Sequence, residues 1–218
     1  MFIIILAIGK LRFSLLIVPA HFSTFMAKHR VLIIGHSFVH RLEAFVQKKR
    51  HKHAFTSLSD IADIHFHGVG GRTIEKFRKF DLEVVRQIAP QIIILELGSN
   101  DLVKLAPETV GSELENLVRD LHDIHSVEVV VVGQVLRRRT RDSVQFNYKV
   151  GQLHQYLKVV LEHLPFCYYW QHRGFWNCKR DLYLPDGVHL NNLGYYKFTR
   201  SIRGAVLKAV KLVSVSVD

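Results

Sequence analysis

Four short motifs with chemically useful side chains follow one another along this chain of 218 residues. They are Gly35-His36-Ser37, Gly70-Gly71-Arg72-Thr73, Gly98-Ser99-Asn100-Asp101 and Asp186-Gly187-Val188-His189. A serine can act as a nucleophile, and a histidine held by a carboxylate can act as its base. A glycine N–H and an asparagine amide can donate hydrogen bonds to an oxyanion. These are the groups that acyl transfer requires, so the motifs together predict an acyl-transfer site.

Each motif taken alone also has a structural interpretation. Ser37 could be the N-cap of a helix, and Asn100 could close a turn at the end of a strand. Asp186 or Asn191 could cap the last helix and leave His189 on the surface. The chemical interpretation therefore depends on the motifs coming together in space.

Apolar patterns along the chain predict the elements that must position these motifs. Short β-branched or apolar runs, typical of parallel strands, occur at 31–34, 63–68, 92–97, 127–132 and 166–170. Apolar residues at helical spacing predict helices over 38–45, 74–88, 110–124, 150–164 and 195–209. The second of these helices is expected to break near Phe80-Asp81 and to end at Pro90.

Strands that alternate with helices predict an α/β fold, a three-layer αβα sandwich with a five-stranded parallel sheet. In such sheets, ligands bind at the carboxyl ends of the strands. Ser37, Gly71 and Asn100 each follow a predicted strand directly, so we expect them to meet at that edge. A tight turn with positive φ would also need glycine after the second strand, and Gly70 could meet that need.

The joint order and spacing of the motifs resemble the SGNH hydrolases, also called GDSL esterases or lipases, over nearly all of the chain after its N-terminal segment. The resemblance implies a flavodoxin-like SGNH hydrolase fold and the cleavage of carboxylic esters or thioesters, without a metal or cofactor. It implies a triad of Ser37, Asp186 and His189, and an oxyanion hole formed by Ser37, Gly71 and Asn100. The chain is also similar to the stand-alone SGNH-type proteins common in invertebrate genomes.

One position departs from the usual pattern of that family. The first block usually reads Gly-Asp-Ser, and here His36 replaces the Asp. That Asp is not the acid of the triad, so activity need not be lost, but the hydrogen bonding around Ser37 comes into question. A titratable imidazole beside the nucleophile could also change the pH profile. The G-x-S-x-G elbow of α/β-hydrolases is absent, because Val39 occupies its last position.

The chain is strongly basic, with 30 Lys and Arg against 19 Asp and Glu and a formal net charge of +11. This balance favours anionic partners, although general solubility explains it equally well. Arg137, Arg138 and Arg139 directly follow the fourth predicted strand, at the same edge of the sheet as the motifs. We predict that they bind substrate and select an anionic ester, with a solvated basic loop as the rival interpretation.

A second class of function stays open. The chain could be an SGNH-fold binding module of weak or no activity, whose basic surface binds nucleic acid or another polyanion. His36 favours this alternative, and the presence of every catalytic residue type argues against it. A small-molecule, lipid or carbohydrate acyl ester is therefore favoured over nucleic acid as the partner.

No metal site is expected. His65 with His67, and His122 with His125, could share a face, but no cysteine or carboxylate completes a standard metal-binding pattern. Two cysteines, Cys167 and Cys178, are too few for a disulfide framework and could be either paired or reduced.

The first 25 residues differ in character from the rest of the chain. They are mostly apolar but carry Lys10 and Arg12, so no uncharged run reaches the roughly 18 residues of a membrane span. We interpret 1–25 as an N-terminal extension outside the fold, and 26–218 as one SGNH hydrolase-like domain. A signal or anchor segment is the rival interpretation, and only an anchor would make a membrane a partner. A location inside the cell is favoured over secretion.

Overall fold

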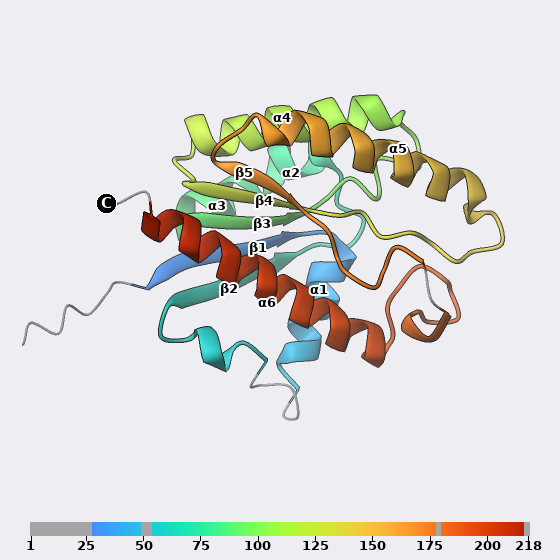
Figure 1. Ribbon diagram of the computed structural model, residues 1–218, viewed down its shortest axis with the longest axis horizontal. Helices are drawn as coiled ribbons and strands as arrows, with labels where there is room; N and C mark the ends of the chain where they lie inside the picture. Colours follow the sequence, from blue (N-terminus) through green and yellow to red (C-terminus); the bar gives the residue numbers. More distant parts are fainter. Residues whose placement is uncertain (1–27, 49–53, 178–179, 216–218) are drawn as a thin grey trace, which may run out of the picture.

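The computed structural model describes residues 28–48, 54–177 and 180–215. Helices and strands alternate along them, and five strands form one sheet (Figure 1). The N-terminal segment 1–25 and Cys178 lie outside the described residues, so the assignment of that segment and the pairing of the cysteines stay predictions. Cys167 is buried, and burial raises the pKa of its thiol to about 12.

All five strands are parallel, in the order β2-β1-β3-β4-β5. Their bounds are β1 His29–Gly35, β2 Ala62–Gly68, β3 Ile92–Glu96, β4 Val129–Gly133 and β5 Cys167–Trp170. The register pairs Val31 of β1 with Ile64 of β2 on one side and with Ile92 of β3 on the other. The predicted five-stranded parallel sheet is confirmed. Its order has a switch point between β1 and β3, and ligands of such sheets bind beyond the strand ends at that point.

Side chains of the central strands enter two separate apolar cores, because successive residues of a strand face opposite ways. Val31 and Ile33 pack with the first and last helices, α1 (Ser37–Val46) and α6 (Asn192–Val215). Leu32 and Ile34 belong to the other core. The helices of that core are α2 (Ile74–Phe80), α3 (Leu82–Ile88), α4 (Pro107–Asp123) and α5 (Ser143–Glu162). Figure 1 shows α1 and α6 on one side of the sheet and the other four helices on the opposite side, so the predicted three layers are confirmed.

Most helices lie where the apolar periodicity predicts them. The expected break after β2 is present, and the residue between the two short helices is the buried Asp81. α5 begins at Ser143, well before the predicted start at Val150. The apolar periodicity does not reveal its first two turns, because they contain few buried apolar residues. At the start of α6, the side-chain oxygen of Asn191 accepts a hydrogen bond from the N–H of Gly194 at 3.0 Å, as in an N-cap.

Two short 3-10 helices complete the elements of the described residues, η2 (Thr56–Leu58) and η3 (Arg180–Leu182). The first precedes the edge strand β2, and the second precedes the loop that contains Asp186. Within the described ranges, no helix combines the length and the apolar character needed to cross a membrane.

Candidate active site

Ser37 is the first residue of α1, directly beyond the carboxyl end of β1. Gly35 allows β1 to lie very close to β3 there, because a Cβ on it would lie 2.1 Å from the carbonyl oxygen of Glu96. The N–H of His36 donates to the same oxygen at 3.2 Å. The serine is thereby fixed at the edge of the sheet, at the positive end of a helix dipole, where negative charge is stabilised.

His36 is the N-cap of α1. Its Nδ1 atom accepts a hydrogen bond from the N–H of Phe38 at 3.3 Å, so the capping interpretation of Ser37 is wrong and its hydroxyl is not used for this purpose. Burial, and then the nearby charges of Arg138 and His189, lower the pKa of His36 to about 4. The ring is therefore neutral above about pH 5. Because the ring does not titrate near pH 7, the expected effect of His36 on the pH profile of activity near neutrality is not supported.

Asp186 and His189 form the pair that their spacing predicts. Asp186 Oδ2 lies 2.7 Å from His189 Nδ1, and Asp186 Oδ1 accepts the N–H groups of Val188 and His189 at 2.9 Å each. Burial acts to raise the pKa of Asp186, but these hydrogen bonds outweigh it and lower the pKa to about 2. Because the carboxylate holds Nδ1, Nε2 is the ring nitrogen left to exchange a proton. Asn191, and not Asp186, is the residue that caps α6.

Backbone contacts hold this loop against the segment that follows β4. The carbonyl of Gly187 accepts the N–H of Arg139 at 2.6 Å. Within the loop itself, the carbonyl of His189 accepts the N–H of Leu184 at 2.7 Å. Gly187 has a φ of +66°, and a Cβ there would lie 2.7 Å from the carbonyl carbon of Arg139. Glycine is therefore required at this position by both the backbone conformation and the close approach.

Gly71 and Asn100 lie on two loops that are tied together. Gly71 has a φ of +70°, so the positive φ of the turn after β2 belongs to Gly71 and not to Gly70. The side-chain amide of Asn100 donates to the carbonyl of Arg72 at 2.9 Å, which leaves its second N–H for another acceptor. The neighbouring Asp101 accepts the N–H of Ile74 at 3.0 Å. The loop after β2 is thus joined to the loop after β3.

Asp81 is a buried anchor of the same loop, and no sequence motif marks it. Its Oδ2 atom lies 2.8 Å from Nε of Arg72, and its Oδ1 atom lies 3.0 Å from Nε2 of His67. One carboxylate therefore holds both the end of β2 and the residue that follows Gly71. The sequence signal was slight, since a polar residue at a helix break is ordinary.

One cleft of about 450 Å³ contains the candidate residues Ser37, Gly71, Asn100 and His189. The other residues that line it are His36, Phe38, His40, Arg41, Gly70, Ser99, Arg138 and Val188. This volume is within the range of small-molecule sites. Among the described residues, no hydrogen bond joins the Ser37 hydroxyl to His189. In free hydrolases this contact is often loose and tightens when substrate binds.

The three consecutive arginines after β4 have different surroundings. Only Arg138 is among the residues that line the cleft. The guanidinium of Arg137 lies 3.8 Å from the ring centroid of Trp176, and its carbonyl accepts the hydroxyl of Tyr183 at 2.9 Å. Arg139 is exposed, with its N–H bonded to Gly187. Of the three predicted substrate-binding residues, the structure brings one into the cleft.

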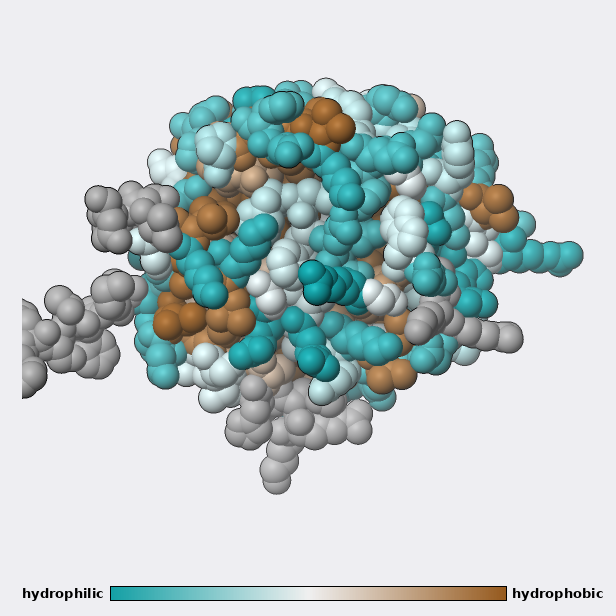
Figure 2. All heavy atoms as spheres, viewed as in Figure 1, coloured by the Kyte–Doolittle hydropathy of each residue, from teal (hydrophilic) through white to brown (hydrophobic). Residues whose placement is uncertain are grey.

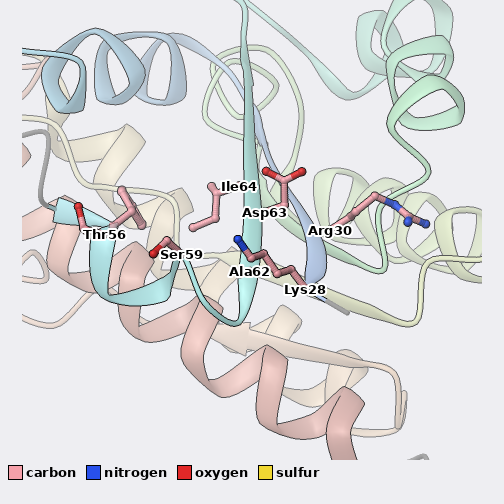
Figure 3. Close-up of a pocket in the computed structure, with 8 residues that line it drawn as sticks. Lys28, Arg30, Thr56, Ser59, Ala62, Asp63 and Ile64 are labelled. Carbon is pink, nitrogen blue, oxygen red and sulfur yellow. The ribbon is translucent and has the colours of Figure 1, made fainter. Parts of the chain in front are cut away.

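A larger hollow of about 770 Å³ lies at the opposite end of the sheet, where β1 and β2 begin (Figure 3). In Figure 3, Asp63 and Ile64 belong to β2, and Thr56 and Ser59 lie on the segment before it, whereas Arg30 extends to the other side. None of the four motifs contributes to this hollow. It therefore lacks the groups that acyl transfer requires.

Three of the four histidines considered as metal ligands have other side-chain partners. His65 lies 3.0 Å from Asp63, and His67 lies 3.0 Å from Asp81. His122 contacts the carbonyl of Val127 at 2.8 Å and stacks on Phe166. In the part of the chain that the structure describes, no group of three His, Cys, Asp or Glu side chains could hold a metal ion.

Residues 34–197 match the GDSL-like lipase/acylhydrolase family, and this range covers most of the chain and every candidate site residue. The chain belongs to this family. Membership supports the hydrolysis of esters in general. The α/β fold with its five-stranded parallel sheet agrees with this family. No curated protein matches the chain.

Solved structures of similar fold include members and relatives of the GDSL-like family. A GDSL-like lipase from Bacteroides thetaiotaomicron is 18% identical, with a TM-score of 0.63 over 83% of this chain and 89% of the other. A catalytic mutant of an acetylxylan esterase from Geobacillus stearothermophilus is 14% identical, with a TM-score of 0.63 over 84% and 94%. An α/β hydrolase from the metagenome of Lake Arreo is 15% identical, with a TM-score of 0.63 over 84% and 95%. At these identities the likeness shows the fold.

Proposed function

We propose that this GDSL-like protein is a serine esterase or acylhydrolase that works through Ser37, His189 and Asp186. The observation that carries the proposal is that one cleft is lined by Ser37, His189, Gly71 and Asn100, while Asp186 holds His189. A hydrolytic site needs a nucleophile, a base, a group that orients the base, and oxyanion donors, all arranged around a single carbonyl group.

In the first half of the reaction, the Ser37 oxygen attacks the ester carbonyl carbon and Nε2 of His189 takes the hydroxyl proton. The carbonyl oxygen becomes an oxyanion, which accepts hydrogen bonds from the N–H groups of Ser37 and Gly71 and from the Asn100 amide. The bond to the alcohol oxygen then breaks. His189 gives its proton to the departing alcohol, and an acyl-enzyme remains.

In the second half, His189 takes a proton from water, and the resulting hydroxide equivalent attacks the acyl carbon. The second oxyanion uses the same donors and collapses with release of the carboxylic acid, and Ser37 recovers its proton from His189. The ionised Asp186 stabilises the imidazolium that forms in both halves and holds the tautomer that presents Nε2.

Labelling with a fluorophosphonate probe tests this mechanism, because the oxygen of an activated serine displaces fluoride from phosphorus and becomes phosphonylated. We expect the full chain to be labelled and the Ser37→Ala and His189→Ala variants to stay unlabelled. A matched variant, Ser59→Ala, should label like the wild type, since Ser59 lies at the other end of the sheet. Folded wild-type protein that resists the probe and hydrolyses no ester would overturn the proposal.

Hydrolysis of a panel of acyl esters is the next measurement. The fold is shared with an acetylxylan esterase, so acetylated sugars belong in the substrate panel with short aryl esters and lipid esters. We expect acetyl esters to be cleaved, since a cleft of about 450 Å³ holds a small acyl group easily.

A second candidate function, polyanion binding, is supported by α6. Its sequence contains no Asp or Glu and five cations, which are Lys197, Arg200, Arg203, Lys208 and Lys211. At 100° per residue they share an arc of about 140° of the helix. Within the described residues, none of them has a carboxylate partner. Figure 2 shows hydrophilic side chains, in teal, mixed with brown and white ones on the face of the molecule that α6 crosses.

Binding of a labelled DNA duplex at increasing salt tests this candidate. Replacing Arg200, Arg203 and Lys208 with Gln should reduce the slope of log K against log salt by about 3, roughly 0.9 for each lost phosphate contact. A control with Lys76, Lys79 and Lys158 replaced, on helices of the other layer, should keep the wild-type slope. Absence of salt-dependent binding by the wild type would rule this function out.

A further inference from the structure

The side chain of Arg138 lies at the junction of two hollows. It lines the catalytic cleft with Ser37 and His189, and it also lines a smaller neighbouring hollow of about 200 Å³. Its guanidinium carbon lies 3.9 Å from the ring centroid of Phe146, and its Nη2 atom lies 3.2 Å from the Ser99 carbonyl oxygen. The charge is therefore held in place between an aromatic ring and the loop that bears Asn100.

No carboxylate neutralises this guanidinium. Among the described residues, none has a carboxylate oxygen within ion-pair distance of Arg138, whereas Arg72, Arg86 and Arg119 each have one. The Nε atom of Arg138 is buried and has no hydrogen-bond partner. Burial also lowers the pKa of this side chain. A half-buried cation without a counter-ion is costly, and a bound anion would remove that cost.

The surroundings of Arg138 are more basic than acidic. Arg41 and His40 also line the catalytic cleft, and Lys149 lines the neighbouring hollow. Two acids belong to the same loops: Asp186 binds His189, and Asp101 accepts the N–H of Ile74 through Oδ1. Burial raises the pKa of the Asp101 carboxyl, so its charge is disfavoured.

Asp142 is the acid among the residues that line the neighbouring hollow, and it is exposed to solvent, where its charge is screened. A negative group that enters the cleft therefore meets a positive potential.

We propose that the cleft selects esters that carry a carboxylate or phosphate group, and that Arg138 binds this anion beside the reacting carbonyl. The inference rests on the proposed esterase function and names its substrate class. A guanidinium suits the task because its planar fork of N–H donors can bind two oxygens of a carboxylate or phosphate at once. The sequence predicts substrate binding by three consecutive arginines, and this proposal assigns it to Arg138, the one that lines the cleft.

The main chain around Arg138 does not depend on its side chain. Asn147 holds it from both directions, because its Oδ1 accepts the Arg138 N–H at 2.8 Å and its Nδ2 donates to the Arg138 carbonyl at 2.8 Å. Replacing Arg138 with Met, which keeps a long side chain over Phe146, should therefore leave the loop folded.

The kinetic test uses three aryl acetates of the same size class with the full chain. They are para-acetoxybenzoate, its neutral methyl ester, and para-acetoxyphenyl phosphate, so that carboxylate and phosphate are distinguished. Arg138→Met should lower kcat/KM about 10- to 100-fold for the anionic esters, as expected for a charged hydrogen bond. The neutral ester should change less than about threefold.

Two controls accompany this variant. Lys158→Met removes one positive charge from an exposed position of α5 and should leave all three rates unchanged. Arg138→Lys keeps the charge but not the fork, so it should recover part of the selectivity. An equal loss for the neutral and the charged esters would overturn the inference, because it would indicate a general structural effect.

Direct binding separates this inference from the esterase proposal. In Ser37→Ala protein, calorimetric titration with para-hydroxybenzoate and with phenyl phosphate should show binding that Arg138→Met weakens at least about tenfold. If no ester is hydrolysed but this binding depends on Arg138, the esterase proposal fails and the anion site stands. If both anions bind equally well without Arg138, the anion site is wrong whatever the hydrolysis assays show.

Discussion

At the scale of single residues, two imidazoles of the cleft have opposite environments. His36 is buried and its Nδ1 accepts a backbone N–H, which requires the neutral ring. His189 Nδ1 lies 2.7 Å from a carboxylate oxygen of Asp186, which leaves Nε2 as the ring nitrogen free of this contact. The residue type alone does not distinguish the helix-capping histidine from the candidate base. The partner of each Nδ1 atom does.

We predict that Asp186→Asn lowers kcat/KM roughly 10²- to 10⁴-fold. The amide cannot stabilise an imidazolium, and it can stabilise the wrong tautomer of His189. Steady-state kinetics on an aryl acetate would measure the loss. Asp181→Asn, an exposed carboxylate outside the cleft, is the matched control and should keep the wild-type rate. Unchanged kinetics in Asp186→Asn would remove Asp186 from the triad.

A second prediction concerns pH and stability at His36. Its pKa is about 4 in the folded protein and 6.5 as an ordinary histidine, so the unfolded chain binds the proton more readily between these values. The contribution to stability is complete above about pH 6.5 and is lost as pH falls towards 4, with a total of about 3 kcal/mol. Denaturant unfolding at pH 7 and pH 4 would measure this slope.

His36→Asn provides the comparison for that slope. Asn does not titrate and can still cap α1, so this variant should lose less stability than the wild type over the same range of pH. His40→Asn replaces the exposed histidine of the same helix and should retain the wild-type slope. Equal slopes in all three proteins would mean that His36 is not held neutral by burial.

At the scale of elements, the site is built where three adjacent parallel strands end. The loops after β1, β2 and β3 bear Ser37, Gly71 and Asn100, and the order β2-β1-β3 places these loops next to one another. The side chain of Asn100 and the carboxylate of Asp81 then hold Arg72 from two directions. The positions of the candidate oxyanion donors thus depend on contacts between loops, as well as on the strands themselves.

Two neighbouring glycines allow a test at this scale. A Cβ on either Gly70 or Gly71 would meet no atom within 4 Å, but only Gly71 has a positive φ, +70°. Gly71→Ala should strain the backbone by about 1–2 kcal/mol and move its N–H, so we expect kcat to fall about tenfold or more. Gly70→Ala should keep kcat within about twofold of the wild type. Similar rates for both variants would exclude Gly71 as an oxyanion donor.

At the scale of the whole molecule, a buried polar network joins the central sheet to the last helix. Oε1 of Glu96, at the end of β3, lies 3.1 Å from Nε2 of His172, and Nδ1 of His172 lies 3.0 Å from Oγ of Ser201 on α6. Gly133 makes room for this carboxylate, since a Cβ there would lie 2.0 Å from Glu96 Oε1. α6 is thereby fixed on the sheet, and so is the His189 loop that precedes it.

We predict that a chain beginning at Met26 keeps the fold and the activity of the full chain. All described elements, both cores and the matched family range lie beyond that residue. Its melting temperature and its kcat/KM for an aryl acetate should agree with those of the full chain within error. A lower melting temperature or a lost activity would show that the first 25 residues belong to the functional domain.

The sequence by itself determined the layers and the local positions of the motifs. Continuous apolar runs such as residues 92–95 are expected to be buried on both faces, which requires helices above and below the sheet. The spacing of Asp186 and His189 placed both in one loop, and the break at Asp81 was visible in the helical periodicity. These are short-range properties, because each depends on residues within one or two turns or one strand.

Only the tertiary structure decided which side chains share a site. In the sequence, Arg137, Arg138 and Arg139 are equivalent candidates. In the structure, Arg137 packs on Trp176 and Arg138 on Phe146, whereas Arg139 is exposed to solvent. The sequence also could not show that Asp81 reaches back to His67, or that burial would keep His36 neutral. Burial, ion pairing and close approach depend on segments far apart in the chain. They exist only once the strands are in register and the helices cover them.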